Sequence, residues 1–245
     1  MRAILRTPVL WVGLLFAALL LDMPILQPFF AHAYPAIHPE IFDRAGFIDL
    51  FLSHLGLVAV ASAAATIVGV AVAIFVTRPA GHDFRTIANI VATVGQTFPP
   101  AAVLALSVPA LGFGPRPTIV ALFLYGLLPI LENAIAGLEG VPPALRDAGL
   151  GMGLSPWQML RDVELPLAAP VILAGVRISV TIGIGTATIG STVGALTFGT
   201  PIFDGLAGNK LPYVLQGAVL VALFAIVTDL LFALLARRLE PVSFR

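Results

Sequence analysis

The sequence contains no cysteine and little charge. The absence of cysteine excludes disulfides, thiolate metal sites and a cysteine nucleophile within its 245 residues. Only 11% of the residues are charged and 59% are hydrophobic, whereas roughly 25% are charged in an average soluble domain. Thirteen Lys and Arg residues balance thirteen Asp and Glu residues, which argues against binding of nucleic acid. With a mean hydropathy of +1.02, the composition predicts an all-α integral membrane protein.

The sequence also lacks the motifs of common enzyme classes. Its one lysine, Lys210, is not part of a G-x-x-x-x-G-K-[ST] loop, so the chain cannot be its own P-loop ATPase. It has no H-E-x-x-H, no G-x-S-x-G and no paired intramembrane carboxylates. Four histidines without ligand spacing are predicted to lie in loops or at helix ends and to bind no metal: His32, His38, His54 and His82. The chain is therefore predicted to be no enzyme and to bind no cofactor, which leaves a transporter, a channel or a membrane scaffold.

Six apolar segments are long enough to cross a membrane, since a span needs roughly 20 residues. They cover about residues 8–30, 50–76, 86–111, 117–137, 169–196 and 211–236. We expect them to form a single permease-like domain over residues 1–245. An even number of spans places both termini on the same side.

The distribution of basic residues predicts the orientation, because short cytoplasmic loops are enriched in Lys and Arg. Three basic residues fall on one side: Arg44, Arg116 and Lys210. Nine fall on the other: Arg2, Arg6, Arg78, Arg85, Arg146, Arg161, Arg237, Arg238 and Arg245. Both termini and the polar segment 142–166 are therefore predicted to be cytoplasmic.

The first apolar segment has a second interpretation. Arg2 and Arg6 precede the apolar run 9–21, and Ala31-His32-Ala33 resembles a signal-peptidase site. The region between them is longer than a typical cleavage region, so a retained span is favoured. N-terminal sequencing that found Tyr34 as the first residue would show cleavage instead.

Three spans carry residues that are unusual in a lipid-facing helix. Gln96-Thr97-Phe98-Pro99-Pro100 predicts a break in the third span, and its freed backbone groups must face protein or water. Glycine and threonine between Gly183 and Gly194, including Gly190-x-x-x-Gly194, predict a closely packed fifth helix. Candidate pathway residues are Gln96, Thr97, Phe98, Pro99, Thr186, Thr188 and Asp229. A simple packing kink and a structural role for Asp229 remain alternatives.

Residues 142–166 predict two short helices. Pro143 begins the first, which runs to about Met152, and Gly153 suits a left-handed C-terminus. Ser155-Pro156-Trp157-Gln158 matches a capping box, so the second helix is expected from Pro156 to about Asp162, with Leu165-Pro166 stopping it. Six apolar side chains are expected to be exposed for docking into a partner's groove: Leu150, Met152, Leu154, Trp157, Met159 and Leu160. The alternative is an interfacial helix anchored in the membrane surface by Trp157.

This segment resembles the coupling loop of ATP-binding-cassette (ABC) importer permeases, E-A-A-x-x-x-G followed after nine residues by I-x-L-P. Asp147-Ala148-Gly149, Gly153 and Val163-x-Leu165-Pro166 stand at the matching spacing, with Asp147, Gly149 and Val163 as departures. The runs 94–100, 124–129, 163–177 and 184–189 resemble importers of glycine betaine, choline and related osmoprotectants, and are most similar to the Yeh-type betaine permeases. The resemblance extends from about Val9 to Arg238.

The resemblance implies a type I ABC importer permease in the cytoplasmic (inner) membrane of a bacterium, embedded in membrane lipid. It implies cytoplasmic ABC ATPase subunits that use ATP, a second permease subunit, either self or a paralogue, and a periplasmic or lipid-anchored binding protein. The residues expected to couple to the ATPase are Asp147, Ala148, Gly149, Gly153, Leu154, Trp157, Leu160, Leu165 and Pro166. A permease for an amino acid or oxyanion, an ion-coupled secondary carrier and a non-transporting scaffold remain alternatives.

Overall fold

A computed structural model describes residues 8–239, and every regular element in that range is helical. The predicted all-α class is therefore confirmed. Arg2, Arg6 and Arg245 lie outside the described residues, and the cytoplasmic placement of the termini stays a prediction. Four helical stretches are long and apolar enough to cross a membrane, and two sharply bent helix pairs raise the number to six. The four are Phe47–Val76, Pro115–Glu139, Pro156–Val193 and Leu211–Arg238.

The chain divides into two compact units, and four long helices contribute residues to both. A single permease domain over 1–245 stays a prediction. The long helices are α3 (Phe47–Val76), α6 (Pro115–Glu139), α9 (Leu165–Ala187) and α11 (Leu211–Leu239). Unit 1 comprises residues 1–61, 99–122 and 181–231, and unit 2 comprises residues 62–98, 123–180 and 232–245.

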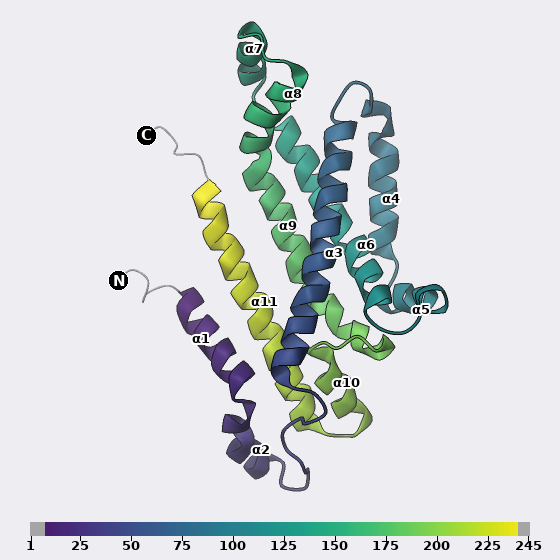
Figure 1. Cartoon of the computed structure of the whole chain (residues 1–245), viewed down its shortest axis with the longest axis vertical. Coiled ribbons are helices and arrows are strands. Elements are labelled where there is room, and N and C mark those ends of the chain that lie inside the picture. Colours follow the sequence, from purple (N-terminus) through teal and green to yellow (C-terminus); the bar gives the residue numbers. More distant parts are fainter. Residues whose placement is uncertain (1–7, 240–245) are drawn as a thin grey trace. The chain divides into compact units, whose positions relative to one another are not determined.

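Unit 1 begins with a bent pair of helices instead of one straight span. The helix α1 (Pro8–Leu21) is followed by the 3₁₀ turn η2 (Met23–Leu26) and by α2 (Gln27–Ala33) (Figure 1). Together these two form the stretch Met23–Ala33, which is bent by 94° from α1. Asp22 at the bend has a non-helical backbone, with φ −140° and ψ 62°. Prolines lie in the first turn of both short helices, where a missing N–H costs little.

His54 lies inside α3 and is fully buried in unit 1, so the expectation of a loop or helix-end position is wrong for this histidine. Its Nδ1 accepts a hydrogen bond from the backbone N–H of Phe198 at 3.3 Å. Its Nε2 lies 3.0 Å from the carbonyl oxygen of Ile184, to which it donates as a neutral imidazole. The ring thereby satisfies one backbone group in the last turn of α9 and one at residue 198, eleven residues beyond the end of α9. Four phenylalanines complete the surrounding aromatic core: Phe16, Phe51, Phe198 and Phe224.

The end of the fifth predicted span is not a regular helix. After Ala187 the chain tightens into the 3₁₀ segment η5 (Thr188–Val193), and Gly194 follows with a left-handed φ of +89°. Gly190 and Gly194 therefore do not share one helix face, and the predicted G-x-x-x-G packing motif is wrong as a pair. Gly190 alone allows a close approach, because a Cβ there would lie 2.6 Å from Cγ2 of Thr118.

An additional short helix, α10 (Gly199–Ala207), precedes α11 in unit 1 and was not predicted. It lies beside the first turns of α11 (Figure 1), where a Cβ on Gly217 would lie 2.6 Å from Cγ1 of Ile202. Four polar contacts fasten the loop between α2 and α3 to α10 and the start of α11. They are Phe42 N to Gln216 Oε1 (3.0 Å), Gln216 Nε2 to Glu40 O (2.7 Å), Lys210 Nζ to His38 O (3.0 Å) and Arg44 Nη1 to Asp204 Oδ2 (3.1 Å).

Unit 2 contains α4 (Arg85–Thr97), α7 (Pro143–Gly151) and α8 (Pro156–Gln158), together with parts of α3, α6, α9 and α11. Between α8 and α9 lies a π-helical turn, η4 (Met159–Glu164). The helices pack around a buried apolar core that includes Ala73, Val76, Ala92, Leu131, Ala134, Ile135, Leu138, Leu160 and Ala168.

The helix that starts at Pro156 does not stop at Leu165-Pro166, and this prediction is wrong. The elements α8, η4 and α9 run on without interruption, and the same helical stretch continues to Val193. A proline inside an α-helix clashes with the carbonyl four residues earlier. The wider π turn that ends two residues before Pro166 gives the ring space, so the helix continues through it.

Candidate functional site

The helix α7 ends in a complete Schellman motif. Gly151, the last residue of α7, is followed by Met152, and Gly153 then adopts the left-handed conformation with φ +81°. The N–H of Gly153 donates to the Leu150 carbonyl at 2.9 Å, and the N–H of Leu154 donates to the Gly149 carbonyl at 3.0 Å. These two bonds satisfy carbonyls that the helix end leaves unpaired. The predicted role of Gly153 as a helix terminator is confirmed.

The predicted capping box of the second helix is also confirmed. The Ser155 hydroxyl accepts from the backbone N–H of Gln158 at 3.3 Å, and the Gln158 side chain accepts from the backbone N–H of Ser155 at 2.9 Å. Pro156 occupies the first turn, where its missing N–H leaves no unpaired donor. Both ends of the connection between α7 and α8 are thus fixed by local chemistry that the sequence alone specifies.

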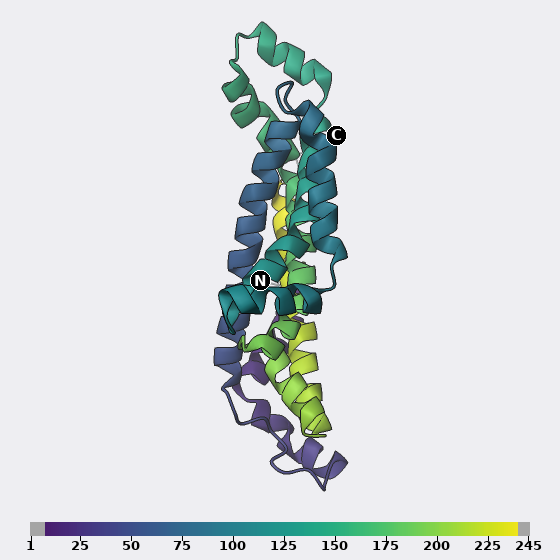
Figure 2. The same cartoon turned by 90° about the vertical axis from the view of Figure 1, so that its right-hand side faces the viewer.

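Three large apolar side chains of this segment are exposed, as predicted: Leu150 by 61%, Met152 by 75% and Trp157 by 66%. Both views of the molecule show α7 and α8 beyond the ends of α3, α4 and α6 within unit 2 (Figures 1 and 2). Together with the exposed Asp147 and Ala148, they form a surface that we call the coupling face: Asp147, Ala148, Leu150, Met152 and Trp157.

The prediction of exposure is wrong for Met159 and Leu160, which are buried. Leu154 and Leu165 are half-buried, and Pro166 is exposed. Met159 and Leu160 belong to the π turn, which directs them toward the remainder of unit 2. Leu160 therefore belongs to the apolar core and is not part of the coupling face.

Gly149, the least helix-favouring departure from the coupling-loop pattern, has a packing reason. It is buried, and a Cβ at this position would clash with Cε of Met159 and would lie 3.2 Å from Cδ1 of Leu154. The glycine lets α7 lie directly against the start of the second helix.

Beneath the coupling face lies a charged cluster that sequence reasoning missed. The carboxylate of Glu164 is buried and is shared by two guanidinium groups, those of Arg78 and Arg146. A second pair, Arg85 with Glu139, joins the start of α4 to the end of α6 in a bidentate contact. In the sequence, the only local indication of this cluster is the acidic residue Glu164 beside Leu165-Pro166. The local pattern does not identify the arginines that pair with it.

The predicted break in the third span is confirmed. The helix α4 ends at Thr97, Phe98 and Pro99 are extended with ψ near 134° and 136°, and α5 (Pro100–Leu111) begins at the second proline. Phe98 is half-exposed, and its carbonyl accepts a hydrogen bond from the Tyr125 hydroxyl. A backbone group freed by the break is thus satisfied by a side chain of α6.

The remaining pathway candidates are divided between the two units. Gln96, half-buried, and Thr97, exposed, belong to unit 2, whereas Pro99, Thr186, Thr188 and Asp229 belong to unit 1. The hydroxyl of Thr188 bonds its own helix at the Gly185 carbonyl, 2.7 Å away. Asp229 is half-buried in α11 and has an interaction partner within the molecule. A shared translocation pathway through these residues stays a prediction.

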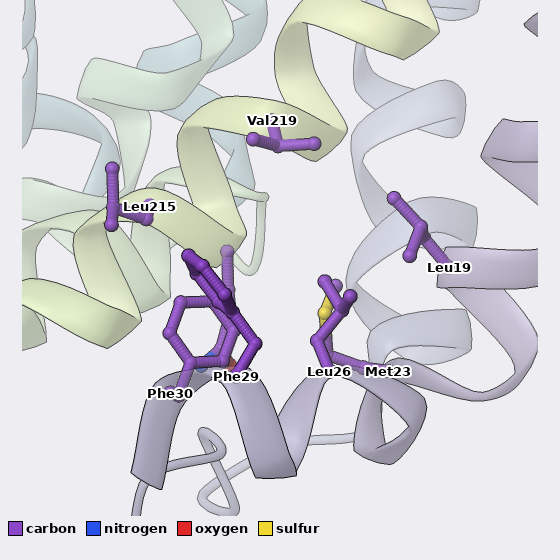
Figure 3. Close-up of a pocket in the computed structure, with 8 residues that line it drawn as sticks. Leu19, Met23, Leu26, Phe29, Phe30, Leu215 and Val219 are labelled. Carbon is purple, nitrogen blue, oxygen red and sulfur yellow. The ribbon is translucent and has the colours of Figure 1, made fainter. Parts of the chain in front are cut away.

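An apolar cavity of about 390 Å³ lies in unit 1 (Figure 3). Leu19 of α1, Met23 and Leu26 of η2, and Phe29 and Phe30 of α2 face Leu215 and Val219 of α11 across it (Figure 3). The one polar residue in its lining, Gln216, already bonds the backbone of Glu40 and Phe42. None of the predicted pathway residues lines this cavity, and its chemistry suits an alkyl chain better than a charged solute.

Several curated permeases are similar in sequence to this chain. The osmoprotectant import permease protein OsmY of Salmonella typhimurium is 45% identical over 77% of this chain and 80% of its own length. OsmW of the same organism is 37% identical over 83% of this chain and 96% of its own length. The choline transport system permease protein OpuBB of Bacillus subtilis is 46% identical over 61% of this chain and 69% of its own length.

Solved structures share the fold. A chain of the inward-facing MetNI methionine ABC transporter superimposes with a TM-score of 0.70 at 22% identity, covering 79% of this chain and 96% of that chain. A chain of an amino acid ABC transporter with histidines gives a TM-score of 0.62 at 20% identity, covering 78% and 95%. At these identities the likeness concerns the fold alone, and it confirms the type I ABC importer permease fold.

A family assignment follows from the sequence match. Residues 65–241 match the family described as binding-protein-dependent transport system inner membrane component. That range contains the break at Phe98, the coupling face and the buried charged cluster. The chain belongs to this family of multi-pass inner-membrane permeases, which are transport subunits and not enzymes.

Proposed function

We propose that this chain is the transmembrane subunit of an ATP-driven importer that moves an osmoprotectant, such as glycine betaine or choline, across the inner membrane by alternating access. The observation that carries the proposal is the coupling face: exposed apolar and acidic side chains on two capped helices beyond the helix ends of unit 2. In a permease of this family, such a face is where a cytoplasmic ATPase would bind.

The substrate class is supported by the names of the relatives. OsmY and OsmW are osmoprotectant import permeases, and OpuBB is a choline transport permease. OpuCB of Bacillus subtilis is named for glycine betaine, carnitine and choline, at 44% identity over 60% of this chain and 67% of its own length. Their named solutes share a quaternary ammonium group, which is bound best by aromatic rings. We assign recognition of the quaternary ammonium group to a separate binding protein. We assign to this chain the pathway through which the solute crosses the membrane.

The proposed mechanism requires three kinds of partner. Two ATPase subunits bind ATP and close against each other, a second permease subunit completes the pathway, and a binding protein delivers the solute. Closure moves the coupling face, and the helices attached to it shift between two arrangements, which is a two-state equilibrium biased by nucleotide. Thr186, Thr188, Asp229 and the break from Gln96 to Pro99 are the proposed pathway residues.

Transport by the purified complex in proteoliposomes tests the proposal. With the ATPase, ATP and the binding protein present, we expect uptake of labelled betaine that unlabelled choline or betaine competes for and methionine does not. Competition by methionine alone would favour an amino-acid permease. Uptake that persists without ATP and collapses with an ionophore would favour a secondary carrier, and the absence of any flux would favour a scaffold.

Binding to the ATPase can be tested separately from transport. Replacing Leu150, Met152 and Trp157 together by serine removes most of the exposed apolar area of the coupling face, and we expect the ATPase to be lost on co-purification. Phe113, which is 78% exposed in the loop between α5 and α6, gives the matched control. The Phe113→Ser variant should retain the ATPase, and equal loss in both variants would contradict the assignment of the coupling face.

A further inference from the structure

Three segments of unit 2 meet at the carboxylate of Glu164, the last residue of the π turn η4, and Arg146 links a fourth segment to them. Arg78, just past the end of α3, donates from Nη2 to Oε2. Arg146 of α7 donates from Nε to Oε1 at 3.0 Å. Arg146 also donates from Nη2 to the carbonyl of Leu138, near the end of α6, at 2.6 Å. One arginine therefore links α7 to both α6 and the start of α9.

The charges in this cluster depend on one another. The Glu164 side chain is only 3% exposed, while those of Arg78 and Arg146 are about one-third exposed. A buried carboxylate is tolerated when it is paired and hydrogen-bonded, as both of its oxygens are here. Without it, Arg78 and Arg146, which line the same small cavity of about 180 Å³, would lose the carboxylate that both of them contact. Glu164 is thus the member of the cluster on which the other two depend.

The π turn places this carboxylate inside the protein. Met159 and Leu160 at its start and Glu164 at its end are buried, and Ala168 continues the same buried stripe in α9. The extra residue of a π turn aligns positions five apart, so Glu164 lies on the same side as Met159. Leu160 and Ala168 also belong to the apolar core of unit 2, together with Val76 and Leu138.

We propose that Glu164, Arg146 and Arg78 form a charge clamp that makes α7 move as one body with the ends of α3 and α6 and the start of α9. This inference rests on the proposed function, because it concerns how movement of the coupling face is transmitted. Within α7, Arg146 is the residue whose side chain hydrogen-bonds to other elements. The three are positioning residues: they touch neither solute nor ATPase in this assignment, and they keep the coupling face rigid.

Single variants separate the links of the clamp. Arg146→Met removes the hydrogen bonds from α7 to the Glu164 carboxylate and to the Leu138 carbonyl. Glu164→Gln removes the negative charge that Arg78 and Arg146 share. Arg78→Met leaves the contact between Arg146 and Glu164 in place. The matched control is Arg161→Gln, because Arg161 pairs with Asp162 at 3.6 Å on the exposed side of the same π turn. Arg146→Lys keeps the charge, but one ammonium group cannot reproduce the two directed contacts of Nε and Nη2.

The first measurement reports rigidity without transport. Because the chain has no cysteine, spin labels can be attached at cysteines introduced at Leu150 of α7 and Thr86 of α4, both exposed in unit 2. Pulsed electron spin resonance on the full-length chain should give a narrow distance distribution in the parent and in Arg161→Gln. We expect a clearly broader distribution in Arg146→Met and Glu164→Gln, and a smaller change in Arg78→Met. Equal widths in all variants would overturn the clamp.

The second measurement uses the reconstituted complex with its ATPase. In Arg146→Met and Glu164→Gln, we expect ATP hydrolysis to continue while solute uptake per ATP falls about fivefold or more, the size of a typical coupling between sites. Arg146→Lys should be intermediate. Unchanged uptake per ATP in both severed variants would overturn the inference. If the parent complex itself shows no ATP-driven uptake, the proposed function fails, and the distance distributions still decide whether the clamp exists.

Discussion

The left-handed glycine between α7 and α8 provides the sharpest test of how the coupling segment is built. Gly153 has φ +81°, and a Cβ added there would meet no atom within 4 Å. The cost of a side chain at this position is therefore a backbone cost and not a steric clash with neighbours. For a residue with a Cβ that cost is about 1–2 kcal/mol, somewhat less for asparagine and more for a β-branched residue such as valine.

Hydrogen exchange at the amides of the Schellman motif measures this backbone cost directly. The N–H groups of Gly153 and Leu154 donate to carbonyls of α7, so opening of the motif exposes them to hydrogen exchange. A cost of 1–2 kcal/mol corresponds to exchange of the Leu154 amide that is about 5- to 30-fold faster in Gly153→Ala. We expect the order Gly, Asn, Ala, Val from slowest to fastest. In the complex, Gly153→Val should also lower solute uptake per ATP while the protein remains inserted.

Gly151 is the matched control, because it lies two residues away and an added Cβ there also meets no atom within 4 Å. It is the last residue of α7 and is not in the left-handed region. Gly151→Ala should therefore slow exchange slightly, since alanine favours a helix over glycine by up to about 1 kcal/mol. Similar acceleration at both positions would refute the assignment of the effect to the positive φ of Gly153.

Three further perturbations probe unit 1. His54→Phe should lower the unfolding temperature in detergent, because two buried backbone groups lose their partners at about 1–3 kcal/mol each; an unchanged midpoint would contradict the bridging role. Gly190→Ala should destabilise by about 1–3 kcal/mol by overpacking against Thr118, and an added Thr118→Ala should recover part of the loss if that contact is the cause. The pKa of Glu40 is lowered chiefly by a hydrogen bond to its own backbone N–H, with His38 assisting. Its contribution to stability is therefore present above the ordinary pKa of about 4.3 and is lost as pH falls through the lowered folded value. Thermal unfolding of Glu40→Gln should match the parent at low pH and fall below it near neutrality, and a constant difference across pH would contradict this.

Features set by local chemistry could be predicted from the sequence. The capping box at Ser155 and the terminator at Gly153 use side chains and backbone preferences within a few residues of one another. The break before Pro100 follows from two successive prolines. Each of these needs no knowledge of the rest of the chain.

Features that depend on distant contacts could not be predicted. The buried position of His54 could not be predicted, because its partners, Ile184 and Phe198, lie more than a hundred residues away. The shared carboxylate of Glu164 pairs with an arginine 86 residues away, and a local pattern cannot show this. The helix α10 begins with Gly199 and Thr200 before a proline, which is a sequence typical of a turn. Close packing explains the glycine, because a Cβ on Gly199 would clash with the Thr188 backbone.

The helix continues through Pro166 instead of stopping there, and this changes the expected mechanics of the coupling face. A helix that stopped there would have left a joint between the second coupling helix and the membrane. The continuous run from α8 through η4 into α9 leaves no such joint, so a force on Trp157 acts directly on α9. The breaks lie instead on both sides of α7, at Pro142 and at Gly153. A helix bounded by two breaks needs its own attachment if it is to transmit force, and the Schellman motif, the contact of Gly149 with Met159 and the bonds of Arg146 supply it. For this reason the variants that weaken coupling should concentrate at α7 and at the residues that attach it, such as Gly153 and Glu164, while substitutions on the exposed side of the π turn should leave coupling intact.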